Sequence, residues 1–153
     1  MIEKIISGGQ TGADFGGLEA GKILGIQTGG TAPKGYRTEL GSNLLLKDFG
    51  LIEHKSSNYY YRTIENVKNS SGTVWFGNSN SPGGKLTIST CKHLRKSYSI
   101  NPDIHQFVKW IESNNIQILN VAGNRESTNP GIEQYVKEFL VNSIKLMIGD
   151  NNE

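Results

Sequence analysis

The chain has 153 residues and a formal net charge of +2, and this length favours one domain that can bury its own core. This net charge is too small to create a strong overall field that would attract nucleic acid or an anionic membrane. Any anion therefore has to be bound by local groups. The single cysteine, Cys91, excludes an internal disulfide and is typical of a reducing compartment.

The beginning of the chain, Met1 to Lys4, does not resemble a signal peptide. No apolar run approaches the roughly 20 residues that a membrane-spanning helix needs. We therefore expect a cytoplasmic protein with neither a membrane nor nucleic acid among its partners.

Short apolar runs alternate with segments of helical spacing along the whole chain. In chain order, the patterns predict a strand at 3–7, a helix at 12–24, a strand at 26–30, a polar loop at 31–39, a packed loop with short extended pieces at 40–56, a helix at 59–69, a strand at 72–77, a loop at 78–84, a helix at 85–96, a strand at 97–100, a helix at 103–111, a strand at 116–123 and a helix at 129–147. This alternation predicts an α/β fold in which a mostly parallel sheet carries helices on both faces. We expect one domain over residues 1–149 and a frayed tail over 150–153.

Several of the predicted strands end in loops rich in glycine and small polar residues, at 8–11, 29–31, 80–84 and 122–127. In parallel α/β sheets, ligands bind beyond the carboxyl ends of the strands. Four such loops at one edge of the sheet therefore predict a binding crevice there.

The first of these loops joins a strand to a helix and has the sequence Gly8-Gly9-Gln10-Thr11, followed by Asp14. Glycines allow a close approach of the backbone, and the helix start offers free N–H groups to a phosphate or carboxylate. The loop matches neither G-x-G-x-x-G nor G-x-x-x-x-G-K-[ST]. An ordinary turn in which Thr11 or Asp14 caps the helix is the alternative.

The second candidate for anion binding is Pro82-Gly83-Gly84 with Thr87, at the start of a helix. A Pro-Gly turn with Ser81 as N-cap would explain the same residues structurally.

Lys34 and Arg37 lie in a polar loop, where they could clamp a phosphate. They could equally be solvated surface charges. Arg62 and Asn66 share one face of a predicted helix, either in the crevice or exposed to solvent.

Catalytic groups are weakly indicated. Asp14 and Glu126 follow predicted strand ends and are the acid/base candidates, although Arg125 and Glu126 could simply pair with each other. The three histidines are far apart in the sequence and lack the spacing of metal ligands, so no metal site is expected.

Three motifs, over residues 8–14, 28–35 and 120–127, closely resemble those of the molybdenum-carrier family, also described as circularly permuted YpsA-like proteins. That family belongs to a Rossmann-like group that includes the molybdenum cofactor carriers and the Lonely Guy phosphoribohydrolases. The resemblance covers residues 3–145. It implies a Rossmann-like three-layer sandwich, a homo-oligomer, and a pocket for a nucleotide-like or pterin-phosphate ligand, with the molybdenum cofactor as one possible cofactor. The residues that it places in the pocket are Gly9, Gln10, Thr11, Asp14, Lys34, Gly83, Gly84, Thr87, Gly123, Arg125 and Glu126.

The chain departs from the Lonely Guy signature P-G-G-x-G-T-x-x-E at two positions. Leu86 replaces the third glycine, and Thr90 stands where the signature has a glutamate that assists N-glycosidic cleavage. The chain therefore keeps the Pro-Gly-Gly part of the signature, which would bind an anion, and lacks its acidic residue.

We weigh three functions. The first is binding of a phosphorylated, nucleotide-like small molecule, either as a molybdenum cofactor carrier or as a sensor of a nucleotide-derived signal such as a cyclic ADP-ribose species. The second is an enzyme that cleaves or transfers at a nucleoside phosphate. The third is a structural or interaction subunit.

Overall fold

The structure is a computed structural model that describes residues 1–151, and of Asp150 and Asn151 it describes the backbone only. Six parallel strands form the main sheet, in the order β5-β2-β1-β8-β6-β7. The strands are β1 (Lys4–Ile6), β2 (Gln27–Ala32), β5 (Leu51–Glu53), β6 (Gly72–Phe76), β7 (Ser97–Ile100) and β8 (Ile118–Gly123). A small antiparallel pair, β3 (Arg37–Thr38) and β4 (Gly41–Ser42), stands apart from them.

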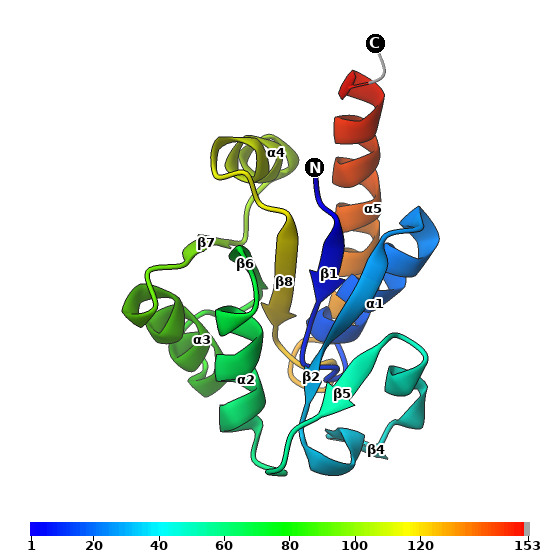
Figure 1. Ribbon diagram of the computed structural model, residues 1–153, viewed down its shortest axis with the longest axis vertical. Coiled ribbons are helices and arrows are strands. Elements are labelled where there is room, and N and C mark those ends of the chain that lie inside the picture. The colour runs from blue at the N-terminus through cyan, green and yellow to red at the C-terminus, as the bar shows by residue number, and fades with distance from the viewer. Residues whose placement is uncertain (152–153) are drawn as a thin grey trace.

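Helices cover both faces of the sheet (Figure 1). One layer holds α1 (Ala13–Leu24), α4 (Ile104–Ser113) and α5 (Ile132–Asn151), with α5 packed against both α1 and α4. The other holds α2 (Tyr59–Lys68) and α3 (Pro82–His93), which contact each other. The predicted α/β sandwich, Rossmann-like with a parallel sheet, is confirmed.

Apolar residues explain the layers. The larger core cluster joins the sheet to α4 and α5, and the rings of Phe76, Phe107 and Phe139 meet edge to face within it. A smaller cluster, around Leu18, Leu46 and Leu51, packs the edge strand β5 against α1. The residues of both clusters are buried, and the burial of this apolar surface holds the helices on the sheet.

Several element bounds differ from the predicted ones. The segment predicted as a packed loop at 40–56 contains strand β5, which pairs with β2, and two short 3₁₀ helices flank the β3–β4 pair, at Lys34–Tyr36 and Leu44–Lys47. Strand β2 runs on to Ala32, into the predicted loop, because β5 supplies it with a second neighbour. Helix α3 begins at Pro82, three residues before its predicted start, since Ser81 caps it there.

The end of the chain was predicted to fray over 150–153. Helix α5 instead extends through Asn151, and residues 152 and 153 lie outside the described residues.

The order of the strands creates the site. The chain first builds β1, β2 and β5 toward one edge, crosses back through α2 to β6 and β7, and finally inserts β8 between β1 and β6. The loops that follow β1, β6 and β8 therefore lie beside one another at the carboxyl edge of the sheet, where the strand order reverses.

Asn66 attaches α2 to the sheet. Its side-chain amide accepts a hydrogen bond from the N–H of Thr31 (2.8 Å) and donates one to the carbonyl of the same residue (2.9 Å). Both residues are buried, so these bonds satisfy backbone groups that water cannot reach. Arg62 lies one turn before Asn66, and its position therefore depends on this anchor.

Candidate functional site at the carboxyl edge of the sheet

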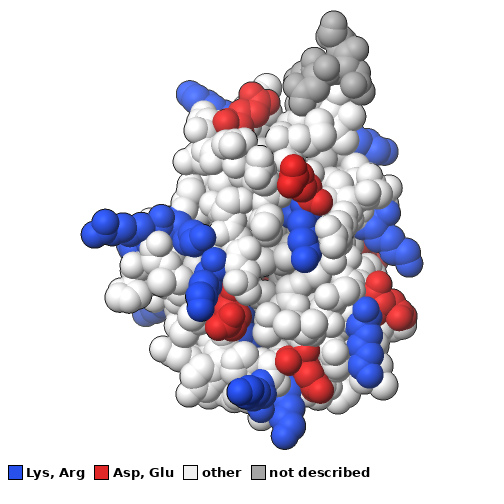
Figure 2. Space-filling model, viewed as in Figure 1, with Lys and Arg blue, Asp and Glu red and all other residues white. Residues whose placement is uncertain are grey.

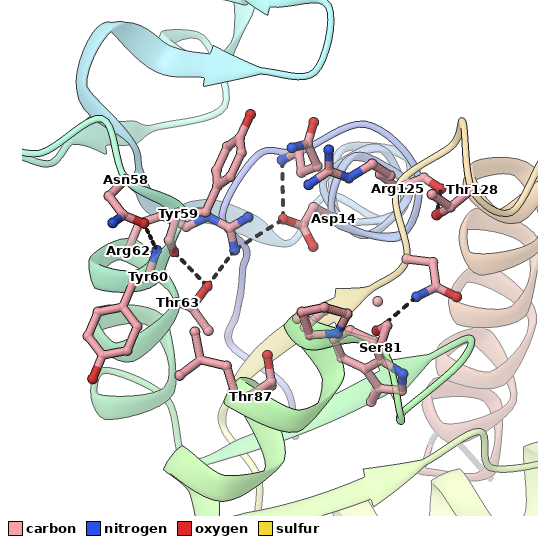
Figure 3. A pocket seen from close by; sticks show the side chains of 18 of the residues that line it. Asp14, Asn58, Tyr59, Tyr60, Arg62, Thr63, Ser81, Thr87, Arg125 and Thr128 are labelled. Atoms are coloured by element: carbon pink, nitrogen blue, oxygen red, sulfur yellow. Dashed lines mark hydrogen bonds and ion pairs between the residues drawn. The ribbon is translucent and has the colours of Figure 1, made fainter.

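A cavity of about 560 Å³ opens at the carboxyl ends of β1, β6 and β8. Its walls come from the loops after these strands and from the first turns of α2 and α3 (Figure 3). This volume lies within the range of small-molecule pockets. On the face seen in Figure 2, Lys and Arg are scattered among Asp and Glu, so no single-sign field covers that face.

Gln10 supplies one polar wall of the cavity. It is only 5% exposed, and its Oε1 accepts hydrogen bonds from the N–H groups of Thr11 (3.0 Å) and Glu39 (2.9 Å). Its Nε2 is buried and has no hydrogen-bond partner among the described residues. A buried donor without an acceptor costs free energy, and in a residue that lines a cavity it marks a place for a ligand oxygen.

Asp14, which is buried, and Arg62, which is half-buried, form an ion pair beside Gln10. The Oδ2 of Asp14 accepts a hydrogen bond from the N–H of Gln10 (3.1 Å) and lies 3.9 Å from Nη1 of Arg62. Burial raises the pKa of the Asp14 carboxyl, although the Arg62 charge and the N–H groups of Gln10 and Gly8 oppose this. Arg62 also donates from Nη1 to Thr63 (2.9 Å), while its buried Nε has no partner among the described residues.

The first turn of α3 forms the opposite wall (Figure 3). The Oγ of Ser81 accepts the N–H of Gly84 (3.2 Å) as a helix cap, and Pro82 has no N–H to offer. The N–H of Gly83 finds no acceptor among residues 1–151. One turn later Thr87 is 3% exposed, and its hydroxyl makes no hydrogen bond within the described part of the chain. This wall therefore presents free donors at the positive end of a helix.

Gly84 is required for the shape of this wall, although it does not line the cavity. A Cβ atom there would lie 2.5 Å from the carbonyl oxygen of Ser79. The loop from 78 to 81 can therefore lie against the helix only when residue 84 has no side chain.

The loop between β8 and α5 closes the third side. Gly123 and Arg125 line the cavity, and the Arg125 guanidinium lies 5.5 Å from the ring centre of Tyr59. The loop is held against the first one at Gly12, whose φ is +83° and where a Cβ would lie 2.4 Å from the carbonyl oxygen of Asn124. Only glycine combines that conformation with that approach.

The structure brings together seven of the residues singled out in the sequence as ligand candidates. They are Gln10, Asp14, Pro82, Gly83, Thr87, Gly123 and Arg125. The other seven do not line the cavity; they are Gly8, Gly9, Thr11, Lys34, Arg37, Gly84 and Glu126.

Local contacts explain most of these positions. Gly8 lies under the Arg62 side chain, and Gly9, with φ +77°, lies against Leu46. The hydroxyl of Thr11 donates to Glu39 and accepts the N–H of Glu126 (3.2 Å).

The two cations of the predicted clamp stay outside. The Lys34 side chain is exposed. Arg37 is also exposed, donates to the carbonyl of Ser57 (3.1 Å) and lies 4.8 Å from the ring centre of Tyr59.

One interpretation of the sequence paired Glu126 with Arg125, and the structure does not show this pair. Its carboxylate accepts hydrogen bonds from the N–H groups of Gly131 (2.6 Å) and Glu133 (3.0 Å), and so caps α5. A carboxylate at this end of a helix also meets the positive end of the helix dipole.

Three aromatic residues of the cavity were not predicted to face a ligand. They are Tyr59 and Tyr60, at the start of the helix predicted at 59–69, and Trp75, in the strand predicted at 72–77. Asn58 could have indicated the two tyrosines from the sequence, because an asparagine before a helical segment is a typical N-cap. The tyrosines and Arg62 that follow it then belong to the first turns of a helix, where site residues are common.

Within residues 1–151 no three His, Cys, Asp or Glu side chains gather closely enough to bind a metal ion. In the same residues, every helix is too short or too polar to span a bilayer.

Comparison with known proteins agrees with the motifs. A model of the circularly permutated YpsA SLOG family matches residues 5–144. The crystal structure of a putative molybdenum carrier protein from Syntrophus aciditrophicus SB is 34% identical, with a TM-score of 0.83, over 91% of this chain and 92% of that one. These findings confirm the family resemblance and support a ligand-binding role in general.

A further similarity is partial. Over 112 residues, 66% of this chain, the sequence is 32% identical to a phosphate acyltransferase of Clostridium beijerinckii (strain ATCC 51743 / NCIMB 8052). The matched region is 34% of that enzyme, so the chain spans about a third of its length.

Proposed function

Because this chain belongs to the circularly permutated YpsA SLOG family, we propose that its cavity binds a phosphorylated, nucleotide-like small molecule. The observation that carries the proposal is a set of donors around one cavity that have no acceptor in the described part of the chain: Nε2 of Gln10, the N–H of Gly83 and the hydroxyl of Thr87. Phosphate oxygens accept such hydrogen bonds at a helix start. Trp75 and Tyr59 offer apolar surface for a planar ring.

Two ligands have the phosphate and the planar ring that these walls would recognise. The molybdenum cofactor is a pterin that carries a phosphate, and the name of the similar protein from Syntrophus aciditrophicus favours it. The α3 start and Gln10 would hold its phosphate and ring. A nucleotide-derived signal such as a cyclic ADP-ribose species has the same two parts, and its binding would make the protein a sensor or a sequestering protein.

Thermal unfolding with a panel of nucleotides and pterins tests the proposal. A ligand at one hundred times its dissociation constant stabilises the folded state by about 2.7 kcal/mol, which raises the melting temperature of a chain of this size by about 5–10 °C. We expect phosphorylated compounds to do so and the matching nucleosides to do so less.

Variants locate the effect. Thr87→Val keeps the side-chain shape, removes the free hydroxyl and should reduce the shift, whereas Lys109→Gln on the exposed side of α4 should leave it intact. Native mass spectrometry of freshly purified protein would identify a ligand that co-purifies. Equal shifts with nucleosides and nucleotides would contradict phosphate recognition.

A second candidate function is a nucleotide-processing enzyme with Asp14 as its acid or base. The observation in its favour is a carboxyl that lies in the cavity wall and whose pKa is raised by burial. Thr90, which stands in the place of the Lonely Guy glutamate, donates its hydroxyl to the Leu86 carbonyl (2.7 Å) and does not line the cavity. Product formation from a nucleoside monophosphate that is lost in Asp14→Asn would favour this function.

A third candidate, an interaction subunit, would remain if no compound raised the melting temperature. Homo-oligomerisation through the helices stays a prediction. Ile23 on α1 and Leu146 on α5 are 57% and 45% exposed, so these two packed helices carry apolar residues on their outer side. Analytical ultracentrifugation of the wild type and of Leu146→Glu tests this prediction. We expect the variant to sediment with a lower molecular mass than the wild type.

A further inference from the structure

Three arginines converge on the ring of Tyr59. The guanidinium carbons of Arg37, Arg62 and Arg125 lie 4.8, 5.3 and 5.5 Å from its centre. They come from the β3–β4 region, from α2 and from the loop after β8, and only the tertiary structure joins them. An aromatic ring attracts each cation, but the cations also repel one another across so short a distance.

The surrounding carboxylates do not balance this cluster. Within residues 1–151, Asp14 is the one acid with an oxygen within 4.0 Å of any of the three arginines, and it lies 3.9 Å from Arg62. The Glu39 carboxylate, which accepts a hydrogen bond from Thr11, also interacts with the charge of Arg125. Three arginines thus stand against two carboxylates, Asp14 and Glu39. Arg62 and Arg125 line the cavity, so the remaining positive charge faces it.

Two buried donors beside the cluster also lack acceptors among the residues that the structure describes. They are Nε2 of Gln10, in a side chain that is 5% exposed, and Nε of Arg62. Figure 3 shows Arg62, Asp14 and Arg125 on one side of the cavity, and Ser81 and Thr87 of α3 on the other. Groups that bind anions thus stand on two facing walls.

We propose that the cavity binds a ligand with two separate anionic groups, one at the start of α3 and the other between Arg62 and Arg125 beside Tyr59. The ligand class is therefore a nucleotide with a second phosphate at a distance from the first. This inference rests on the proposed function, which needs only the α3 position. Arginine suits the second position because its planar fork can donate two hydrogen bonds to one phosphate.

Calorimetry with matched ligands tests the inference. The probes are the 5′-monophosphates and the 3′,5′-bisphosphates of the four ribonucleosides, so that contacts to base and sugar are shared within each pair. With wild-type protein we expect at least one bisphosphate to bind about tenfold or more tightly than its monophosphate, the effect of roughly one charge-assisted hydrogen bond.

The variants separate the two walls. Arg125→Gln should abolish most of the preference for the bisphosphate and leave monophosphate affinity within about threefold, and Arg125→Lys should restore part of the preference. Thr87→Val should weaken both ligands. Lys109→Gln removes one exposed charge from the opposite layer and should change neither. Melting curves without ligand establish that each variant is folded.

The outcomes are distinct. Monophosphate binding without any bisphosphate preference, or an equal loss of both ligands in Arg125→Gln, would overturn the second anionic position and leave the proposed function standing. Failure of every probe to bind would overturn this inference, and the thermal shifts with pterins would then decide the proposed function.

Discussion

Glu133 provides a test of the electrostatics at the interface between α1 and α5. Its carboxyl faces Glu19 on α1, whose Oε2 lies 3.8 Å from Nζ of Lys137. Burial, the hydrogen bond to Glu19 and the charges of Glu19 and Glu126 raise the pKa of Glu133 from 4.5 to about 7, and Lys137 opposes this only in part.

The raised pKa determines how stability changes with pH. Between pH 4.5 and about 7 the folded protein keeps the Glu133 proton and the unfolded chain releases it. The free energy of unfolding therefore falls as pH rises through this interval and is lowest above it. Glutamine does not ionise and can still donate a hydrogen bond to Glu19. We expect Glu133→Gln to match the wild type near pH 4 and to be more stable near pH 8.

The size of this gain follows from the shift. An increase from 4.5 to about 7, at 1.36 kcal/mol per unit, sets an upper limit of about 3.4 kcal/mol. Glu133 and its neighbours are only half-buried, and solvent screening reduces the gain to about 1 kcal/mol. A change of this size raises the melting temperature by about 2–4 °C at pH 8.

Thermal melts of both proteins at pH 4 and pH 8 measure the difference. Glu112→Gln, at an exposed position on α4, is the control for removal of a carboxylate. An equal gain at both pH values would attribute the effect to packing and refute the electrostatic explanation. A loss of stability at pH 8 would refute it as well.

Two further substitutions test the supports of the site. Gly84→Ala should lower the free energy of unfolding by about 1–3 kcal/mol, because the added Cβ would overlap a backbone carbonyl. Gly83→Ala is the control and should cost far less, since the nearest atom to its Cβ lies at 3.8 Å. Urea unfolding of the two variants measures the difference. Asn66→Ala leaves both backbone groups of Thr31 buried without partners and should lower the free energy of unfolding by about 3 kcal/mol. The measurement is urea unfolding, in which we expect a lower midpoint and an unchanged dependence of the free energy on urea concentration. Lys68→Ala, exposed on the same helix, is the control, and equal midpoints for the two α2 variants would refute the role of the Asn66 anchor.

The sequence predicted the α/β architecture because apolar periodicity is a local property. Each strand and helix that carries a long apolar run, such as residues 72–76 or 118–123, was located within a few residues. Strand β5 was missed as a strand since it has three residues and depends on pairing with β2. Its apolar contacts, to Leu46 and Leu18, come from distant segments that its own residues do not reveal.

The glycine-rich loops and the family motifs were likewise legible in the chain, and they indicated the carboxyl edge of the sheet as the place of the cavity. What the chain order could not decide was the partner of each polar side chain. Glu126 caps α5, Asn66 anchors α2 to β2, and three arginines meet at Tyr59. Such contacts join residues far apart in the sequence, up to 115 positions in the hydrogen bond from the N–H of Glu126 to the hydroxyl of Thr11. Hydrogen bonds and charges act over a few ångströms of space, and that proximity exists only after the sheet has brought the loops together.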